Sequence, residues 1–297
     1  MVLTKKIKTE ISRKKTLYLM LFVVCVPYFI FFLYPMIDSL IIGFYRWSGI
    51  SPKMDFVWID NYIRLIFDEY LRSALINTLI LTFAAIFLHT VIGFAFAWLA
   101  FKHRRTGRLF ISIVYIPMVV SFVAVGLMWR WIYDPNIGFL TQFFKSIKLE
   151  ALAAPWLANK TTALIGIILT GTWYGVGFST IVFSAGLRAI PQSMFDSAKI
   201  DGLSDLQAIR HVILPQLKEV IAVIFIFIAA SSLKTFDLIW ALTGGGPARD
   251  TEVVSLFMYQ EAFASMKAGY ASAAGIILFL AGILLVVIYL RITRVKV

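Results

Sequence analysis

The sequence predicts an all-α integral membrane protein with six transmembrane helices and both termini in the cytoplasm. The chain is 60% hydrophobic and 15% charged, whereas soluble domains carry about 25% charged residues, and its mean hydropathy is +0.86. A bilayer core about 30 Å thick requires roughly 20 apolar helical residues for each crossing. Six segments meet this requirement, and none shows the short alternating pattern of a membrane β-strand. They are residues 17–45, 74–101, 109–133, 161–186, 219–240 and 269–290.

Basic residues are concentrated on alternate connections between these segments. The stretches 1–16, 102–108, 187–219 and 291–297 carry 17 basic and five acidic residues, and the rest of the chain carries 11 of each. All of the formal net charge of +12 therefore lies on two tails and two loops. Such a bias is typical of the cytoplasmic side of a membrane protein. We therefore expect these stretches to be cytoplasmic, and the charge does not indicate a nucleic-acid partner.

We expect four regions along the chain. A basic N-terminal tail, 1–16, precedes the first helix and its outer loop, 17–73. That helix is too long for a signal-peptide core, and no small-residue cleavage site follows it, so we expect it to be retained. Residues 74–290 hold the other five helices and a polar cytoplasmic loop at 187–218, and 291–297 form a cytoplasmic tail.

The residue types that metal sites and catalytic centres require are sparse. One cysteine, Cys25, excludes a disulfide framework within the chain, and the three histidines are scattered. We interpret each histidine as a packing or surface residue and predict no metal ligands and no catalytic residues. The stretch TGGGPARD at 243–250 lacks the Lys-Ser/Thr ending of a phosphate loop. If ATP drives this protein, another subunit must hydrolyse it.

The connection between the fourth and fifth helices reads IPQSMFDSAKIDGLSDLQAIRHVILP from Ile190 to Pro215. Pro191 should end the preceding helix, since proline lacks the N–H donor and restricts the residue before it. Ser193 is a suitable N-cap, and Asp196 three residues later could complete a capping box. A short helix over 194–201 should then end at Gly202 in the left-handed conformation.

A second helix should follow directly. Ser204 can cap it, and Leu206, Ile209 and Ile213 recur at helical spacing. Pro215 should stop it just before the fifth membrane helix. Two capped helices joined in this way form a stiff element that could transmit a push, which an unstructured loop could not.

This connection resembles the EAA loop in permease subunits of binding-protein-dependent ABC importers. Asp196, Ser197 and Ala198 occupy the E-A-A places, with Asp for Glu and Ser for Ala as departures. The DG pair and the I-x-LP ending are matched by Asp201, Gly202, Val212, Leu214 and Pro215. Further similarities, which extend over about 74–290, are NTL at 77–79, LKTFD, LTGGGP and GYASA at 269–273. These strings are most similar to the carbohydrate-uptake, maltose-type branch.

The resemblance implies a type I ABC importer permease fold and a set of partners. It implies a heterodimer with a second homologous permease, two ATPase subunits that hold ATP and magnesium, and an extracytoplasmic binding protein that delivers a saccharide. This chain would bind no cofactor and would lie in a bacterial or archaeal cytoplasmic (inner) membrane, in contact with lipid. The ATPase-coupling residues would be Asp196, Ser197, Ala198, Asp201, Gly202, Leu214 and Pro215.

Two helices could line a substrate pathway. Aromatic residues on a glycine-opened fourth helix suit the flat C–H faces and hydroxyls of a sugar, although its glycines could equally serve close helix packing. In the fifth helix, Lys234 and Asp237 are three residues apart and could neutralise each other, either along the pathway or as a structural pair. The expected pathway residues are Gly171, Trp173, Tyr174, Gly175, Phe178, Ser179, Ser231, Ser232, Lys234, Thr235 and Asp237.

Three alternatives remain beside the saccharide importer. An importer of glycerol phosphate or another polyol phosphate would call for two or more basic residues facing the cavity. A secondary transporter should show internal repeats and buried charges able to carry a coupling ion. A membrane-embedded enzyme would need acids, histidines or cysteines clustered at one membrane face. Neither a clear repeat nor such a cluster is evident in the sequence.

Overall fold

A computed structural model describes residues 18–103, 105–149, 152–153 and 155–293. The N-terminal tail 1–16 and the last four residues of the C-terminal tail, which we expect to be cytoplasmic, lie outside the described residues. The chain divides into two compact units, one made of the residues up to Leu65 together with Glu261–Ile276, the other of Ile66–Gln260 together with the chain from Ile277. Each unit is described by itself.

The smaller unit begins with a helix over Tyr18–Ile42. A short antiparallel pair follows, in which Tyr45 is opposite Phe56. This strand pair departs from the all-α expectation, because the polar turn after Trp47 lets two extended segments meet. Asn61 secures this region by donating to the carbonyls of Gly43 and Tyr45, both at 2.9 Å. The elements are η1 (Phe29–Leu33), α2 (Tyr34–Ile42), β1 (Tyr45–Arg46), β2 (Asp55–Phe56) and α3 (Asp60–Ile66).

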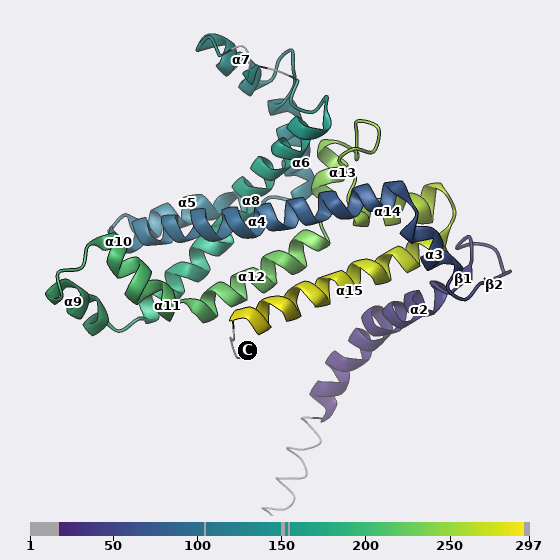
Figure 1. The fold of residues 1–297 in the computed structure, drawn as a ribbon, viewed down its shortest axis with the longest axis horizontal. Helices are drawn as coiled ribbons and strands as arrows, with labels where there is room; N and C mark the ends of the chain where they lie inside the picture. Colours follow the sequence, from purple (N-terminus) through teal and green to yellow (C-terminus); the bar gives the residue numbers. More distant parts are fainter. Residues whose placement is uncertain (1–17, 104, 150–151, 154, 294–297) are drawn as a thin grey trace, which may run out of the picture. The chain divides into compact units, whose positions relative to one another are not determined.

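The larger unit is built on two long helices, α4 and α8, that pack along one another (Figure 1). Asp68 caps the first by accepting from the Leu71 N–H at 3.0 Å, and Asn159 caps the second through the Thr162 N–H at 3.1 Å. In the same unit α5 packs on α8, α12 on α4, and α13 on α6. The helices up to this connection are α4 (Glu69–Lys102), α5 (Gly107–Val119), α6 (Phe122–Ile132), α7 (Phe139–Ser146) and α8 (Lys160–Ala189).

The second half of the chain is more broken. The connection after α8 forms α9 (Gln192–Ile200), α10 (Asp205–Ala208), η3 (Ile209–Ile213) and α11 (Leu214–Gln216). The chain continues as α12 (Lys218–Leu233), α13 (Asp237–Leu242), α14 (Val254–Tyr259), η4 (Gln260–Ala264) and α15 (Ala268–Thr293). The second half of α15 packs on α12, where Tyr289 stacks on Phe225 with 3.7 Å between ring centroids.

By length and composition, four helices of the described chain could each cross a membrane: Tyr18–Ile42, Glu69–Lys102, Lys160–Ala189 and Ala268–Thr293. Two bent helix pairs raise the number to as many as six if each pair forms one span. They are Gly107–Val119 with Phe122–Ile132, bent by 95°, and Asp205–Gln216 with Lys218–Leu233, bent by 72°. The fold is thus mostly helical with four to six candidate spans.

The expectation of one helix over 109–133 is wrong as to its continuity, because the segment forms two helices, α5 and α6, bent by 95°. Pro117 lies inside α5, where its missing N–H removes one hydrogen bond from the last turns of the helix, and α5 ends two residues later at Val119. Val120 and Ser121 then adopt extended conformations, with ψ of 144° and 135°, and α6 starts in a new direction. A hydropathy window cannot register this break because both sides of it are equally apolar.

The expectation of one helix over 219–240 is also wrong. The helix α12 ends at Leu233, and α13 begins at Asp237. Tight turns from Lys234 N–H to Ser231 O and from Thr235 N–H to Ser232 O close α12. The freed Thr235 carbonyl accepts a 2.6 Å hydrogen bond from the Ser255 hydroxyl. A contact from 20 residues away therefore stabilises a break within an apolar stretch.

Gly177 sets the spacing between α5 and α8 and supports a first prediction. A β-carbon on Gly177 would lie 2.7 Å from the Val114 carbonyl oxygen, a backbone atom that cannot move alone. We expect Gly177→Ala to lower the free energy of unfolding by about 1–2 kcal/mol, because overpacking outweighs the gain in helix propensity. Gly171→Ala is the matched control, since its β-carbon would meet its nearest neighbour at 3.8 Å. Thermal unfolding in detergent compares the two, and equal stability would contradict the packing role.

Candidate functional site

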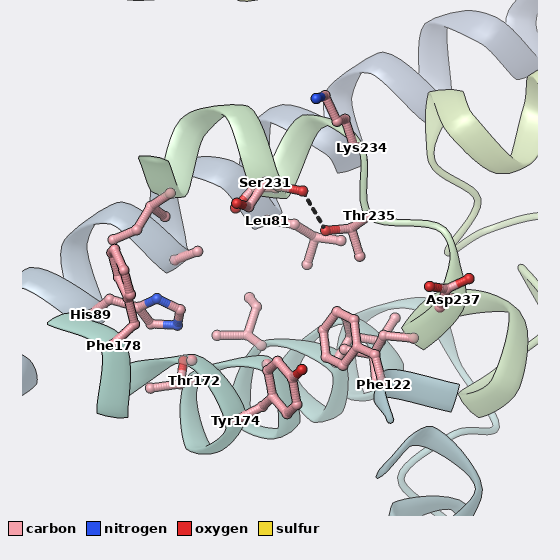
Figure 2. Close-up of a pocket in the computed structure, with 18 of the residues that line it drawn as sticks. Leu81, His89, Phe122, Thr172, Tyr174, Phe178, Ser231, Lys234, Thr235 and Asp237 are labelled. Atoms are coloured by element: carbon pink, nitrogen blue, oxygen red, sulfur yellow. Dashed lines mark hydrogen bonds between the residues drawn. The ribbon is translucent and has the colours of Figure 1, made fainter. Parts of the chain in front are cut away.

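A cavity of about 290 Å³ lies in the larger unit between α4, the α5–α6 bend, α8 and the α12–α13 break (Figure 2). Both irregular stretches of backbone border it. Non-helical backbone at membrane depth is tolerated where it lines a cavity. Nine of the eleven expected pathway residues line it: Gly171, Tyr174, Gly175, Phe178, Ser231, Ser232, Lys234, Thr235 and Asp237.

Two stacked aromatic pairs form much of the wall. Phe122 stacks on Tyr174 with 4.3 Å between ring centroids, and Phe178 stacks on Phe227 at 4.0 Å. The Tyr174 hydroxyl donates to the Met118 carbonyl at 3.4 Å, which links α8 to the α5–α6 bend. The cavity therefore offers flat apolar faces, with hydroxyl groups from α12 beside them.

Lys234 and Asp237 do not neutralise each other as expected. Among the described residues no ion pair joins them, and Figure 2 shows their side chains on either side of the break without pointing at one another. The reason is the break itself, since one residue follows α12 and the other opens α13. The cavity wall thus carries one cationic and one anionic side chain that are separate from each other.

Trp173 and Ser179 lie outside the cavity lining. Residues 171, 174, 175 and 178 are three or four positions apart and so share one helix face, and Trp173 lies on another face. Trp173 instead meets Trp129 edge-on at 5.6 Å. Ser179 is fully buried and packs against Gly93 of α4. A β-carbon added to Gly93 would lie only 2.6 Å from the β-carbon of Ser179.

Several lining residues were not expected from the sequence, above all His89 and Thr172. His89 projects from α4 into the cavity, and its ring rests directly against Gly175, which has no β-carbon to displace it. The available signal was a histidine in the middle of an apolar span, where an ionisable residue generally faces a cavity or a partner. Within the part of the chain that the structure describes, no three His, Cys, Asp or Glu side chains could hold a metal ion together.

The connection after α8 differs from expectation at its first cap. Ile190 is extended, with ψ of 127°, as a residue before proline should be. The next helix, α9, starts at Gln192 with Pro191 as its N-cap, and no described side chain caps it, so the expected role of Ser193 is wrong. Asp196 does not complete a capping box either: it accepts from the Gln192 side chain at 3.1 Å. Proline suits the start of a helix, and the helix therefore begins two residues early.

Two further signals of this connection, Gly202 and Ser204, appear in the structure as expected, and a third, Pro215, does not. Gly202 has a φ of +70°, and the Leu203 N–H closes α9 by donating to the Ala198 carbonyl at 3.0 Å. Ser204 and Gln207 form a reciprocal capping box at the start of α10. Pro215 does not stop this second helix as expected, because the π-helical turn η3 precedes it and α11 continues to Gln216.

The connection is anchored to the end of α4. Phe195 stacks on Phe101 at 5.3 Å, and Asp205 forms an ion pair with Lys102. Two large apolar side chains remain outside this anchor: Ile200 is 85% exposed and Leu206 is 74% exposed. One side of the connection is thus fixed to the membrane helices, while the other presents apolar groups.

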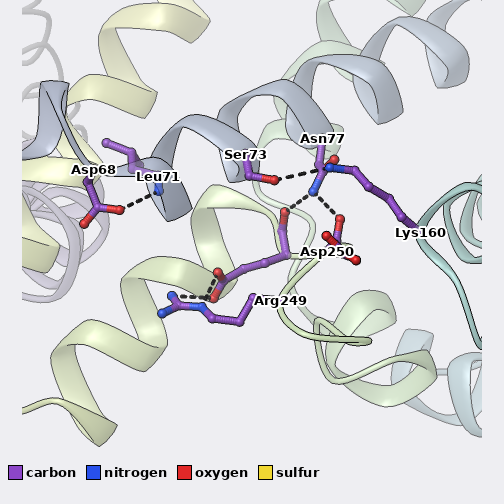
Figure 3. Close-up of polar contacts among 8 residues, drawn as sticks. Asp68, Leu71, Ser73, Asn77, Lys160, Arg249 and Asp250 are labelled. Atoms are coloured by element: carbon purple, nitrogen blue, oxygen red, sulfur yellow. Dashed lines mark hydrogen bonds and ion pairs between the residues drawn. The ribbon is translucent and has the colours of Figure 1, made fainter.

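A cluster of polar side chains fixes the segment after the TGGGP string (Figure 3). Asn77 of α4 donates to the Asp250 carbonyl at 2.9 Å and to the Glu252 carbonyl at 2.8 Å. Arg249 forms a two-point ion pair with Glu252, at 2.7 and 3.0 Å. The NTL string is thereby joined to two backbone carbonyls that follow the LTGGGP string, more than 170 residues away along the chain.

Curated relatives cover most of this chain. It is 33% identical over 276 residues to a probable ABC transporter permease protein of Pyrococcus horikoshii, covering 89% of this chain and 94% of that one. It is 33% identical to the multiple sugar-binding transport system permease protein MsmF of Streptococcus mutans, over 84% and 86%. It is 30% identical to the trehalose/maltose transport system permease protein MalF of Thermococcus litoralis, over 99% and 98%.

A solved structure shares the fold. A chain of a bacterial ABC transporter involved in the import of the acidic polysaccharide alginate superposes with a TM-score of 0.83 at 23% identity, covering 97% of this chain and 98% of that one. This likeness shows a type I ABC permease fold. Residues 89–295 also match the family described as binding-protein-dependent transport system inner membrane components. The chain belongs to this family of ABC transporter permeases.

Proposed function

We propose that this chain is one of two homologous permease subunits of an ATP-driven importer, and that its cavity receives a saccharide from an extracytoplasmic binding protein. The observation that carries this proposal is the cavity wall of two stacked aromatic pairs with hydroxyls beside them. Aromatic faces accept the C–H faces of sugar rings, and hydroxyls pair with their polar edges. The relatives named for sugars agree with this substrate class.

The charges of the cavity favour a saccharide over a polyol phosphate. Among the described lining residues Lys234 is the single Lys or Arg side chain, and Asp237 is the single Asp or Glu. A dianionic phosphate would be better stabilised by two or more cations. A neutral ligand needs no net charge in the wall.

We propose six membrane spans, with the bent pair of α5 and α6 counted as one span and the fifth span beginning at α12. The basic stretches then lie in the cytoplasm of a bacterial or archaeal cell, and the loops between them face outward. On this topology α9 and α10 lie on the cytoplasmic side and the segment joined to Asn77 lies on the outer side. The proposal is supported by the alternation of basic loops along the sequence.

The connection from 187 to 218 is proposed to couple this subunit to an ATPase. Its residues Asp196, Ser197, Ala198, Asp201, Gly202, Leu214 and Pro215 shape a capped element whose exposed Ile200 and Leu206 could enter a groove on the partner. ATP and magnesium would be held by the two ATPase subunits. ATP binding would favour one state of the permease pair, and alternating access follows from the differing affinity of each partner for the two states.

The same helices connect the proposed coupling element with the cavity. One end of α8 leads into Pro191, and the middle of α8 carries Tyr174 and Phe178. On the other side, α12 begins after Leu217 and ends at the cavity break. Any tilt of these two helices would therefore move the coupling element and the cavity wall together.

The first test is purification of the chain in mild detergent from its native membranes, with mass spectrometry of what accompanies it. An ATPase subunit and a second permease, with saccharide uptake in liposomes that requires ATP and a binding protein, would support the proposal. A chain that is isolated alone or as a homodimer and transports without ATP would support the secondary transporter instead.

The proposed docking role of Ile200 and Leu206 has a separate test. We expect the pair of changes Ile200→Glu and Leu206→Glu to weaken association with the ATPase at least about tenfold, since a central apolar interface residue contributes about 2 kcal/mol or more. The control is Ile137→Glu, which is 67% exposed but lies outside the connection. The measurement is the amount of ATPase that co-purifies, and an equal yield in both variants would contradict the docking role.

A further inference from the structure

Two buried polar atoms beside the cavity have no partner among the described residues. They are His89 Nε2 and Thr172 Oγ1, in side chains of residues that are each 9% exposed. Buried polar atoms are nearly always hydrogen bonded, and each exception calls for an explanation. Both residues line the same cavity, one from α4 and the other from α8. A ligand in the cavity would supply the missing partner.

His89 is the stronger of the two. A threonine hydroxyl on a helix can turn to a carbonyl of the preceding turn, as Thr180 does with Val176 at 2.9 Å. The histidine has no such recourse for Nε2, because its ring is fixed against Gly175. Figure 2 shows the ring beside Phe178 at the end of the cavity that lies away from Asp237.

We propose that His89 determines specificity by hydrogen bonding, through Nε2, one hydroxyl of the bound saccharide, with Thr172 beside it. This inference rests on the proposed function and adds a contact from α4 that the family resemblance did not supply. A sugar held against the aromatic wall would present hydroxyls at its edge. A site built to hydrogen bond a substrate hydroxyl rejects an analogue that lacks it.

The experiment uses the complete importer with its binding protein in liposomes, and trehalose and maltose as first probes. Monodeoxy derivatives of the transported sugar are then compared in wild type and His89→Phe, which keeps a ring but removes both nitrogens. We expect at least a fivefold loss of parent-sugar uptake in the variant. For wild type, uptake of one monodeoxy derivative should be lower than uptake of the parent sugar by a similar factor. For His89→Phe, uptake of that derivative and of the parent sugar should be nearly equal. The same binding protein serves both, so its own preferences cancel in the ratio.

Further variants separate this role from a structural one. Gly175→Ala should displace the ring without removing it and reproduce the selective loss, and His89→Gln should restore part of the uptake. Ser184→Ala is the control, because its buried hydroxyl also has no partner among the described residues but does not line the cavity. The inference is overturned if wild type transports the sugar and the His89 variants keep wild-type ratios for every derivative. If wild type transports no saccharide, the proposed function fails and this inference fails with it.

Discussion

Gly202→Val is expected to reduce ATP-driven uptake by roughly tenfold while all membrane helices remain inserted. Gly202 has a φ of +70°, a conformation that costs a residue with a β-carbon about 1–2 kcal/mol, and 1.4 kcal/mol corresponds to a factor of ten. No described atom lies within 4 Å of a β-carbon built at this position. The cost is therefore conformational, and the chain can relieve it by unwinding the end of α9. The proposed coupling element would then transmit less of the ATPase movement.

The matched control is Gly202→Asn, because asparagine tolerates the left-handed conformation better than other residues with a side chain. The measurements are uptake and ATP hydrolysis in the same liposomes. Uncoupling appears as hydrolysis that persists without transport in the valine variant, while the asparagine variant stays near wild type. Full transport by Gly202→Val would refute the coupling role of this residue.

Asn77→Leu is expected to lower the free energy of unfolding by about 2 kcal/mol or more. The amide of Asn77 is fully buried and donates to two backbone carbonyls, those of Asp250 and Glu252. Leucine has a similar size but no donor, so both carbonyls would lose a buried partner, at about 1–3 kcal/mol for each group left unsatisfied. The segment after the TGGGP string would separate from α4 before the rest of the unit unfolds.

Gln142→Leu is a suitable control, since its amide makes a 2.7 Å hydrogen bond to the Asn136 carbonyl at an exposed position. We expect it to change stability by less than about 0.5 kcal/mol. Both variants are compared by denaturant titration in mixed micelles and by proteolysis within 243–252. A smaller loss in Asn77→Leu than in Gln142→Leu would show that the two carbonyls find other partners.

Sequence reasoning succeeded best where the physics is local. The left-handed Gly202, the extended residue before Pro191 and the Ser204 cap each depend on a few neighbouring residues, and the structure contains all three. The prediction was wrong where two such local signals compete for the same helix start. Ser193 could cap a helix, but Pro191 starts that helix earlier, and two valid local signals compete at the same place.

The candidate cavity was only partly predictable for a different reason. Helical periodicity groups Gly171, Tyr174, Gly175 and Phe178 on one face, and that face does line the cavity. The same periodicity could have excluded Trp173, whose residue type suggested a sugar contact. His89 was not predicted to line the cavity, because its ring packs against Gly175, which is 86 residues later in the chain. A lone histidine belongs to no spacing pattern that would indicate this contact.

The sequence by itself determined the membrane class, the alternation of basic loops, and the Gly202 turn and Ser204 cap of the connection after α8, since these features depend on composition or on residues a few positions apart. The tertiary structure alone decided where the apolar segments break and which side chains share the cavity. The break after Leu233 depends on Ser255, and the separation of Lys234 from Asp237 follows from that break. Contacts of this kind join residues far apart in the chain, so only the packed helices reveal them.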